Sequence, residues 1–142
     1  MILHFTDPHF NKNAFAFIAK MAASFCADVC ISGDFLDVRR TETHPLSEQI
    51  AWVQTWMREQ AFKLFLCSGN HDPDADEDPF TASWLRALHN GETVFTDGHR
   101  GKGSDGEIIG CVPYGYVFPP HEGIFENVDV ILLLEPPFGS DT

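Results

Sequence analysis

The sequence predicts an α/β fold built on a parallel sheet, and three observations support this class. The 142 residues fit one compact domain with a sizeable core. Short apolar runs alternate along the chain with segments whose apolar residues recur at helical spacing. Over residues 1–67 this alternation gives the order strand, helix, strand, helix, strand. That order is typical of parallel strands joined by right-handed crossovers.

The first three elements follow one another along residues 1–32. Ile2–Thr6 is an apolar segment that we expect to form the first strand. Asn11 or Asn13 then supplies the N-cap of a helix, because an asparagine side chain can accept hydrogen bonds from free N–H groups at a helix start. The apolar residues at helical spacing are Phe15, Ile18, Ala22 and Phe25. Asp28–Ser32 is the second predicted strand.

A second helix is predicted after Pro45. Its apolar residues at helical spacing are Leu46, Ile50, Val53 and Met57. Trp52 and Trp56 flank this face, and we expect both indole rings to pack in the core. Phe62–Cys67 is the third predicted strand.

The second half of the chain contains shorter elements. Asp78 and Pro79 suit the N-cap and the first position of a short helix, and Asn90-Gly91 is its stop signal. This helix carries Trp84, Leu85 and Leu88. Three more strands are predicted at Thr93–Thr96, Glu107–Val112 and Val128–Leu134.

Composition and charge exclude several classes of protein. Apolar residues make up 44% of the chain and charged residues 21%, which excludes a disordered or low-complexity protein. The formal net charge of −12 repels a phosphate backbone, so a nonspecific nucleic-acid binder is excluded unless metal ions reverse the sign locally. The first residues show no signal-peptide pattern, and the longest apolar run, Val130–Leu134, is far shorter than the ~20 residues of a membrane span. We therefore expect a cytoplasmic protein with no membrane partner.

None of the four cysteines belongs to a CxxC pair, and most lie in apolar segments. They are Cys26, Cys30, Cys67 and Cys111. Free cysteines in such segments prefer the protein interior. We therefore expect buried free thiols rather than a zinc or redox site.

Polar side chains follow each of the first three predicted strands. These clusters are residues 6–9 (TDPH), 33–37 (GDFLD) and 69–72 (GNHD). Each cluster alone has an ordinary explanation as a turn, in which glycine supplies an unusual backbone angle or aspartate caps the next segment. Together they are expected at one edge of the sheet, where the carboxyl ends of parallel strands lie. Carboxylate, amide and imidazole donors in one place suit a hydrolytic Mn²⁺, Fe or Zn²⁺ site better than a structural thiolate zinc site.

The succession DxH, GDxxD and GNHD resembles the pattern of the calcineurin-like metallophosphoesterases. The resemblance is specific over residues 1–72 and extends more loosely to Gly139. It implies an αββα sandwich and an enzyme that hydrolyses a phosphomonoester or phosphodiester by metal-activated hydroxide. Two metal ions in such a site lower the pKa of a bridging water towards ~7 and clamp the attacking and departing oxygens.

The resemblance also implies a set of metal ligands. Asp7 and His9 would bind one ion, and Asn70 would bind a second. Asp34 would bridge the two ions, because a carboxylate can donate one oxygen to each. We expect Mn²⁺, with Fe or Zn²⁺ as alternatives.

Two further residues have catalytic roles by the same resemblance. His71 would bind no metal but would stabilise or protonate the leaving oxygen of the substrate, and Asp37 would hold its ring. The substrate is a phosphate ester whose identity stays open. Nucleic acid belongs to this class, although the sequence predicts no basic surface to bind it.

Two departures from the family pattern change these expectations. Leu134 stands where a ligand histidine is expected on the last strand, and no GHxH segment occurs. We therefore expect one domain over residues 1–142 that is shortened at its C-terminus, one firmly bound ion and weak hydrolysis. The alternative is an impaired or inactive relative that acts as a binding or interaction module. Apolar residues of the last strand would lack a partner within the chain, which favours self-association.

An acidic run begins in the third polar cluster. It consists of Asp72, Asp74, Asp76, Glu77 and Asp78. The run lacks the spacing and the glycine of an EF-hand calcium loop. We therefore expect a solvated loop at the rim of the metal site.

Overall fold

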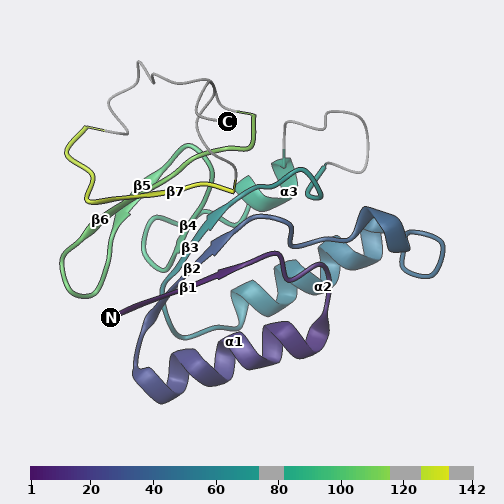
Figure 1. Ribbon diagram of the computed structural model, residues 1–142, viewed down its shortest axis with the longest axis horizontal. Helices are drawn as coiled ribbons and strands as arrows, with labels where there is room; N and C mark the ends of the chain where they lie inside the picture. Colours follow the sequence, from purple (N-terminus) through teal and green to yellow (C-terminus); the bar gives the residue numbers. More distant parts are fainter. Residues whose placement is uncertain (74–81, 116–125, 135–142) are drawn as a thin grey trace, which may run out of the picture.

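The computed structural model describes residues 1–73, 82–115 and 126–134 and arranges them in layers (Figure 1). In these residues, the first sheet has the strand order β1-β2-β3-β4, and every neighbouring pair is parallel. Its strands are β1 Ile2–Thr6, β2 Asp28–Ser32, β3 Leu64–Cys67 and β4 Val94–Phe95. The parallel order confirms the predicted α/β class, and the third and fourth strands are shorter than expected.

Two helices cover one face of this sheet (Figure 1). They are α1 Lys12–Phe25 and α2 Leu46–Arg58. In β2, Val29 and Ile31 pack in the core beneath the helices, whereas Cys30 belongs to a second core on the opposite face. This alternation follows from the two-residue repeat of a strand. No helix within the described residues is long and apolar enough to cross a membrane.

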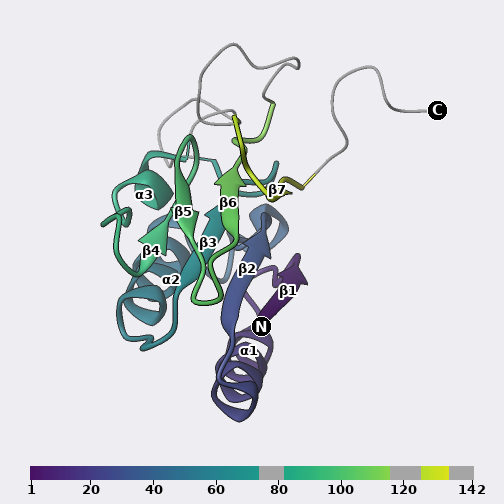
Figure 2. The same ribbon diagram turned by 90° about the vertical axis from the view of Figure 1, so that its left-hand side faces the viewer.

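A second sheet packs on the opposite face of the first (Figure 2). It contains β5 Arg100–Lys102, β6 Ile108–Cys111 and β7 Val130–Leu132. Strand β6 pairs with β5 in antiparallel and with β7 in parallel orientation. The core between the sheets consists of Cys30, Phe65, Cys67, Phe95, Ile109, Cys111 and Leu132.

Helix α1 begins at the cap that the sequence offers. The side chain of Asn11 accepts hydrogen bonds from the N–H groups of Asn13 and Ala14 at 3.0 and 3.3 Å. Its buried residues are Phe15, Ile18 and Ala22. Phe25, which shares their spacing, is instead 48% exposed. It is the last residue of α1, and the chain turns away at Cys26 with a φ of 49°.

Trp56 packs in the core of the domain, as predicted, whereas Trp52 is only partly buried and packs against that core. The rings of Trp52 and Trp56 contact Phe15 edge to face, with ring centroids 5.3 and 4.9 Å apart. Helix α2 thereby packs on α1 as well as on the sheet. The ring of Phe10, in the loop before α1, likewise contacts His44 before α2 and Trp52 in α2, with centroids 5.4 and 5.9 Å apart.

The second half of the chain departs more from the sequence predictions. The sequence does not predict β5, because Arg100–Lys102 has no apolar pattern. Gly101 allows this strand to pass close to Phe95, since a Cβ at Gly101 would lie 2.3 Å from Cδ1 of that ring. Helix α3, Ser83–Arg86, is a single turn. Its predicted start at residues 78–79 lies outside the described residues.

Three of the four cysteines are buried free thiols, as predicted. These are Cys30, Cys67 and Cys111, whereas Cys26 is exposed in the turn after α1. The prediction for Cys26 is wrong because the helix ends one residue earlier and leaves this side chain outside the core. Burial raises the pKa of Cys30 to about 12, so the Cys30 thiol stays protonated at neutral pH.

Candidate metal centre

The carboxyl ends of β1, β2 and β3 lie at the same level of the sheet. Thr6 pairs with Ser32, and Ser32 pairs with Cys67. The loops after these strands therefore begin side by side. They carry Asp7 and His9 after β1, Asp34 and Asp37 after β2, and Asn70 and His71 after β3.

Asp7, His9 and Asp34 form a group of the metal-binding type. Their ligand atoms lie within 4.8 Å of one another. Nε2 of His9 is 3.6 Å from Oδ1 of Asp7 and 3.9 Å from Oδ2 of Asp34. Atoms that share one ion at bond lengths of about 2.0–2.2 Å lie roughly 3–4 Å apart. The three side chains predicted for the first ion therefore have the spacing that an ion requires.

The backbone of this site is held in a costly conformation. Asp7, His9, Phe10 and Asp34 have φ values of 55°, 44°, 50° and 55°. Such left-handed residues cost about 1–3 kcal/mol each when they are not glycine, and they concentrate at functional sites. Backbone bonds between the two loops maintain the conformation. The N–H of His9 donates to the carbonyl of Asp34 at 2.9 Å, and the N–H of Phe10 donates to the carbonyl of Phe35 at 2.8 Å.

The charge environment of Asp34 favours a bound cation. This side chain is buried, and burial raises its pKa. The N–H of His71 donates to Oδ1 of Asp34 at 2.9 Å and opposes that shift, whereas the neighbouring Asp7 adds to it. A positive charge between the two carboxylates would favour their ionised forms. The donor set and its charge therefore fit a divalent ion.

Asp72 connects the second and third loops, and the sequence prediction for it is wrong. Instead of being solvated, its side chain is 1% exposed. Its two oxygens accept the N–H groups of Asp34, Leu36 and Gly69 at 2.7, 3.0 and 2.8 Å. Burial raises the pKa of Asp72 to about 8, and these hydrogen bonds oppose the shift. The rest of the acidic run lies outside the described residues.

His71 lies against the metal-binding group. The centroids of its ring and that of His9 are 4.9 Å apart. Together with Asp37, the two histidines form a second group whose donor atoms lie within 4.8 Å. Nδ1 of His9 and Nδ1 of His71 are buried, and neither has a hydrogen-bond partner among the described residues. The hydrogen-bonding capacity of both nitrogens is therefore unused within the described residues, and the second group of donors could hold an ion.

Asp37 faces His71 but forms its hydrogen bonds elsewhere. Its Oδ1 lies 4.0 Å from Nδ1 of His71, which is too far for a hydrogen bond. Nε of Arg39 donates to the same oxygen at 2.9 Å. The hydrogen bonds from Arg39 lower the pKa of Asp37. The support of His71 by Asp37 stays a prediction, and no sequence pattern indicates the Arg39 contact.

Gln49 of α2 is a second supporting residue that the sequence does not predict. It is completely buried. Its Oε1 accepts the N–H of Asp37 at 2.8 Å, and its Nε2 donates to the carbonyls of Asp37 and His44 at 3.1 and 2.8 Å. The segment 37–44, which includes the short helix η1 Val38–Arg40, is thereby fixed to α2. A polar residue within the apolar face of a helix is the signal that could have pointed to it.

Leu134 lies beside Asp34, where the resemblance implies a histidine. A Cβ at Gly69 would lie 2.5 Å from Cδ2 of Leu134 and 2.3 Å from Oδ1 of Asp34. An apolar side chain therefore occupies the space next to Oδ1 of Asp34, and only glycine fits at position 69. Asn70 is exposed in the same loop, and its role as a ligand of a second ion stays a prediction.

Comparisons with known proteins agree with this geometry. A family model described as calcineurin-like phosphoesterase matches residues 1–137. Searches of curated proteins and of solved structures found no match. The family match spans all three loops of the metal centre and nearly the whole chain. With its parallel sheet and its Asp and His side chains gathered at the strand ends, the chain belongs to the calcineurin-like phosphoesterase family.

Proposed function

We propose that this protein is a metal-dependent phosphoesterase that hydrolyses a phosphomonoester or a phosphodiester. The observation that supports this most is the group of Asp7, His9 and Asp34, whose ligand atoms lie within 4.8 Å of one another. A divalent ion in this group would lower the pKa of a coordinated water and neutralise the charge of the phosphate. The cytoplasm stays its predicted compartment.

The proposed ligands of the first ion are Asp7, His9 and Asp34, and Asn70 is the proposed ligand of a second. Oδ2 of Asp34 faces His9, whereas Oδ1 accepts the N–H of His71 at 2.9 Å. Because this hydrogen bond engages Oδ1, we expect the second position to hold an ion weakly. We propose one firmly bound Mn²⁺ per chain, with Fe or Zn²⁺ as alternatives.

His71 is the proposed proton donor to the leaving oxygen. Its ring lies beside the metal-binding group, and its Nδ1 faces Asp37, so Nε2 is the proposed donor atom. A protonated imidazole at this place can donate a proton as the ester bond breaks. Asp37, whose carboxylate lies 4.0 Å from Nδ1, is the proposed positioning residue for this ring.

Metal content and turnover measured on the same samples test this proposal. After dialysis against Mn²⁺, we expect about one ion per chain and Mn²⁺-dependent release of nitrophenolate from p-nitrophenyl phosphate or bis(p-nitrophenyl) phosphate. Asp34→Ala should lose both properties. Glu92→Gln, which changes an exposed carboxylate outside the site, should keep both. Full turnover in Asp34→Ala would overturn the proposal.

A binding or interaction module is the second candidate, and Leu134 favours it. This side chain places an apolar surface next to Asp34, where a further ligand would strengthen ion binding. Val130 and Ile131 of β7 are 37% and 42% exposed and are the surface we propose for self-association. A chain that binds Mn²⁺, hydrolyses neither nitrophenyl ester and sediments as an oligomer would support this function instead.

A further inference from the structure

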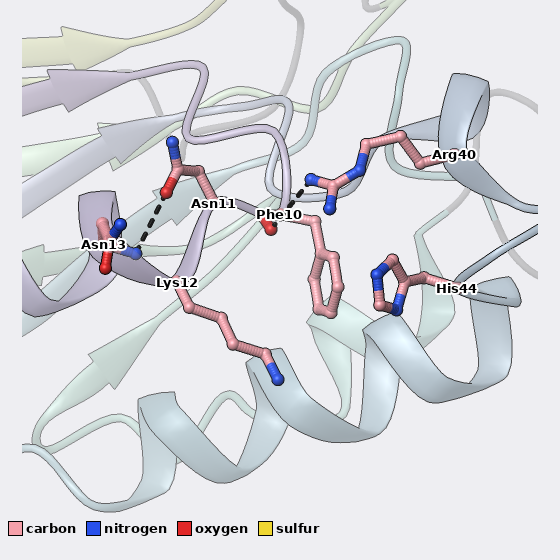
Figure 3. Close-up of a pocket in the computed structure, with 6 residues that line it drawn as sticks. All are labelled: Phe10, Asn11, Lys12, Asn13, Arg40 and His44. Carbon is pink, nitrogen blue, oxygen red and sulfur yellow. Dashed lines mark hydrogen bonds between the residues drawn. The ribbon is translucent and has the colours of Figure 1, made fainter.

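A pocket of about 390 Å³ opens next to the metal centre. Figure 3 shows the side chains that line it, which are Phe10, Asn11, Lys12, Asn13, Arg40 and His44. They come from two segments, the start of α1 and the connection between β2 and α2. The volume lies within the range of small-molecule sites, roughly 300–1,000 Å³.

Two side chains bring positive charge to this pocket. Nζ of Lys12 and Cζ of Arg40 each lie 5.8 Å from the centre of the Phe10 ring. Among the residues that the structure describes, no carboxylate forms an ion pair with either of them. The chain has nine Lys and Arg against 21 Asp and Glu. Two unpaired cations over one ring therefore create a local positive field in an acidic protein, which attracts an anion.

Contacts with Phe10 and α2 hold the segment that carries Arg40 and His44 in place. The rings of His44 and Phe10 have centroids 5.4 Å apart, and Nδ1 of His44 lies 3.5 Å from Oε1 of the exposed Glu48. The buried Gln49 donates to the carbonyl of His44 at 2.8 Å. Because α2 holds this segment, the pocket is largely preformed before a ligand binds. Preorganisation of this kind lowers the entropy cost of binding.

The pocket and the metal centre share their loops. Phe10 follows His9 directly, and consecutive Cα atoms lie about 3.8 Å apart. The N–H of Arg40 donates to the carbonyl of Asp37 at 3.2 Å, and Nη1 of Arg40 donates weakly to the carbonyl of Phe10 at 3.5 Å. The same two loops, after β1 and after β2, therefore carry the metal-binding side chains and line the pocket.

We propose that this pocket binds a second phosphate group of the substrate, with Arg40 and Lys12 as its anion-binding side chains. Guanidinium and ammonium groups are the common protein partners of phosphate. The half-buried ring of His44 can contact the sugar or base that carries the phosphate, whereas the Phe10 ring behind it is only 3% exposed and supports the His44 ring from the core. The inference rests on the proposed hydrolysis and narrows its substrates to esters with two phosphates, such as a nucleoside bisphosphate or a short oligonucleotide.

Phosphate binding without metal tests the pocket independently of hydrolysis. In EDTA, titration with inorganic phosphate should shift the NMR signals of the His44 ring in a saturable way. Arg40→Gln and Lys12→Gln should each weaken this binding at least about 10-fold, as expected for a lost charge-assisted contact. Lys20→Gln and Arg58→Gln, which change exposed cations on α1 and α2, should not. An absent shift at His44, or equal affinity in Arg40→Gln, would overturn the proposal.

Turnover with Mn²⁺ tests the substrate class. Thymidine 3′,5′-bisphosphate should have a KM at least about 10-fold below that of thymidine 5′-monophosphate. Arg40→Gln should bring the two KM values together, Arg40→Lys should restore part of the difference, and Arg58→Gln should keep it. A 5′-phosphorylated dinucleotide, compared with the bisphosphate, distinguishes an oligonucleotide from a mononucleotide substrate.

The two proposals fail in different ways. If no ester is hydrolysed while the phosphate titration keeps its dependence on Arg40, the hydrolysis is refuted and the anion pocket stands. If both nucleotides are hydrolysed with equal KM, the hydrolysis stands and the second-phosphate pocket is refuted. Thermal melting followed by circular dichroism checks that Arg40→Gln is folded, and Lys12→Gln provides the same test should that variant unfold.

Discussion

Substitutions at the metal centre should distinguish metal ligands from the proton donor by their effects on metal content and on turnover. We expect His71→Ala to keep its Mn²⁺ content and to lose turnover by about 10²–10⁴, the usual contribution of a general acid. Asp34→Asn should lose metal first, because a neutral amide attracts a cation less than a carboxylate does. Metal analysis and turnover on both variants provide the measurement.

His99→Ala is the matched control for this comparison, because this exposed histidine lies outside both metal-type groups. It should retain both metal and activity. Loss of metal in His71→Ala would instead place His71 among the ligands, as the second group of donor atoms around Asp37 allows.

Asp72 contributes to stability through backbone hydrogen bonds rather than through a substrate contact. Asp72→Asn replaces one of two accepting oxygens by an NH₂ group, so at least one N–H among Asp34, Leu36 and Gly69 loses its partner. We expect the free energy of unfolding to fall by about 1–3 kcal/mol and Mn²⁺ affinity to fall with it. Urea unfolding and Mn²⁺ titration measure both, with the exposed Glu59→Gln as control. Unchanged stability would show that these bonds contribute nothing net.

At the scale of elements, strand ends were predictable and supporting contacts were not. The order of strands and helices alone predicts that Asp7, Asp34 and His71 lie at one edge of the sheet, because the carboxyl ends of parallel strands lie together. Asp72 is misassigned because four acidic residues follow it within six positions, and only the fold shows that three N–H groups converge on its carboxylate. Arg100–Lys102 forms a strand by pairing with the edge of β6. No local sequence pattern predicts this pairing.

Gln49 tests whether α2 positions the loop that carries Asp37. Gln49→Ala removes the partners of the Asp37 N–H and of two carbonyls in a fully buried place. We expect a loss of about 1–3 kcal/mol in the free energy of unfolding, together with lower kcat, because Asp37 and Arg40 lose their fixed positions. Gln54→Ala also removes a hydrogen bond from α2, to the carbonyl of Trp84, and should lower stability without lowering kcat. Equal kcat in both variants would contradict this role for α2.

At the scale of the whole molecule, the buried Asp97 carboxylate joins the ends of β3 and β4 through Ser68, and Ser68 in turn contacts the segment after β6 of the second sheet. Asp97 follows β4 and is 2% exposed. Its Oδ1 accepts the N–H of Ser68 at 2.8 Å, and Oγ of Ser68 accepts the N–H of Tyr114 at 3.0 Å. Oδ2 of Asp97 has no hydrogen-bond partner within the described residues. Burial raises the pKa of Asp97, and the hydrogen bonds from Ser68 and the charges of Arg86 and His99 oppose that shift.

This raised pKa predicts how stability changes with pH. Above the ordinary value of 3.8, the folded chain holds the Asp97 proton that the unfolded chain has released. The Asp97 contribution to stability therefore falls as pH rises from about 4 towards the pKa of the folded state. Asp97→Asn removes this dependence, so the stability of the variant relative to the parent should increase as pH rises from about 4 towards neutrality. Urea unfolding across this range measures the difference, and the exposed Glu92→Gln controls for the loss of one negative charge. A constant difference across the range would mean that Asp97 titrates alike in the folded and unfolded chains.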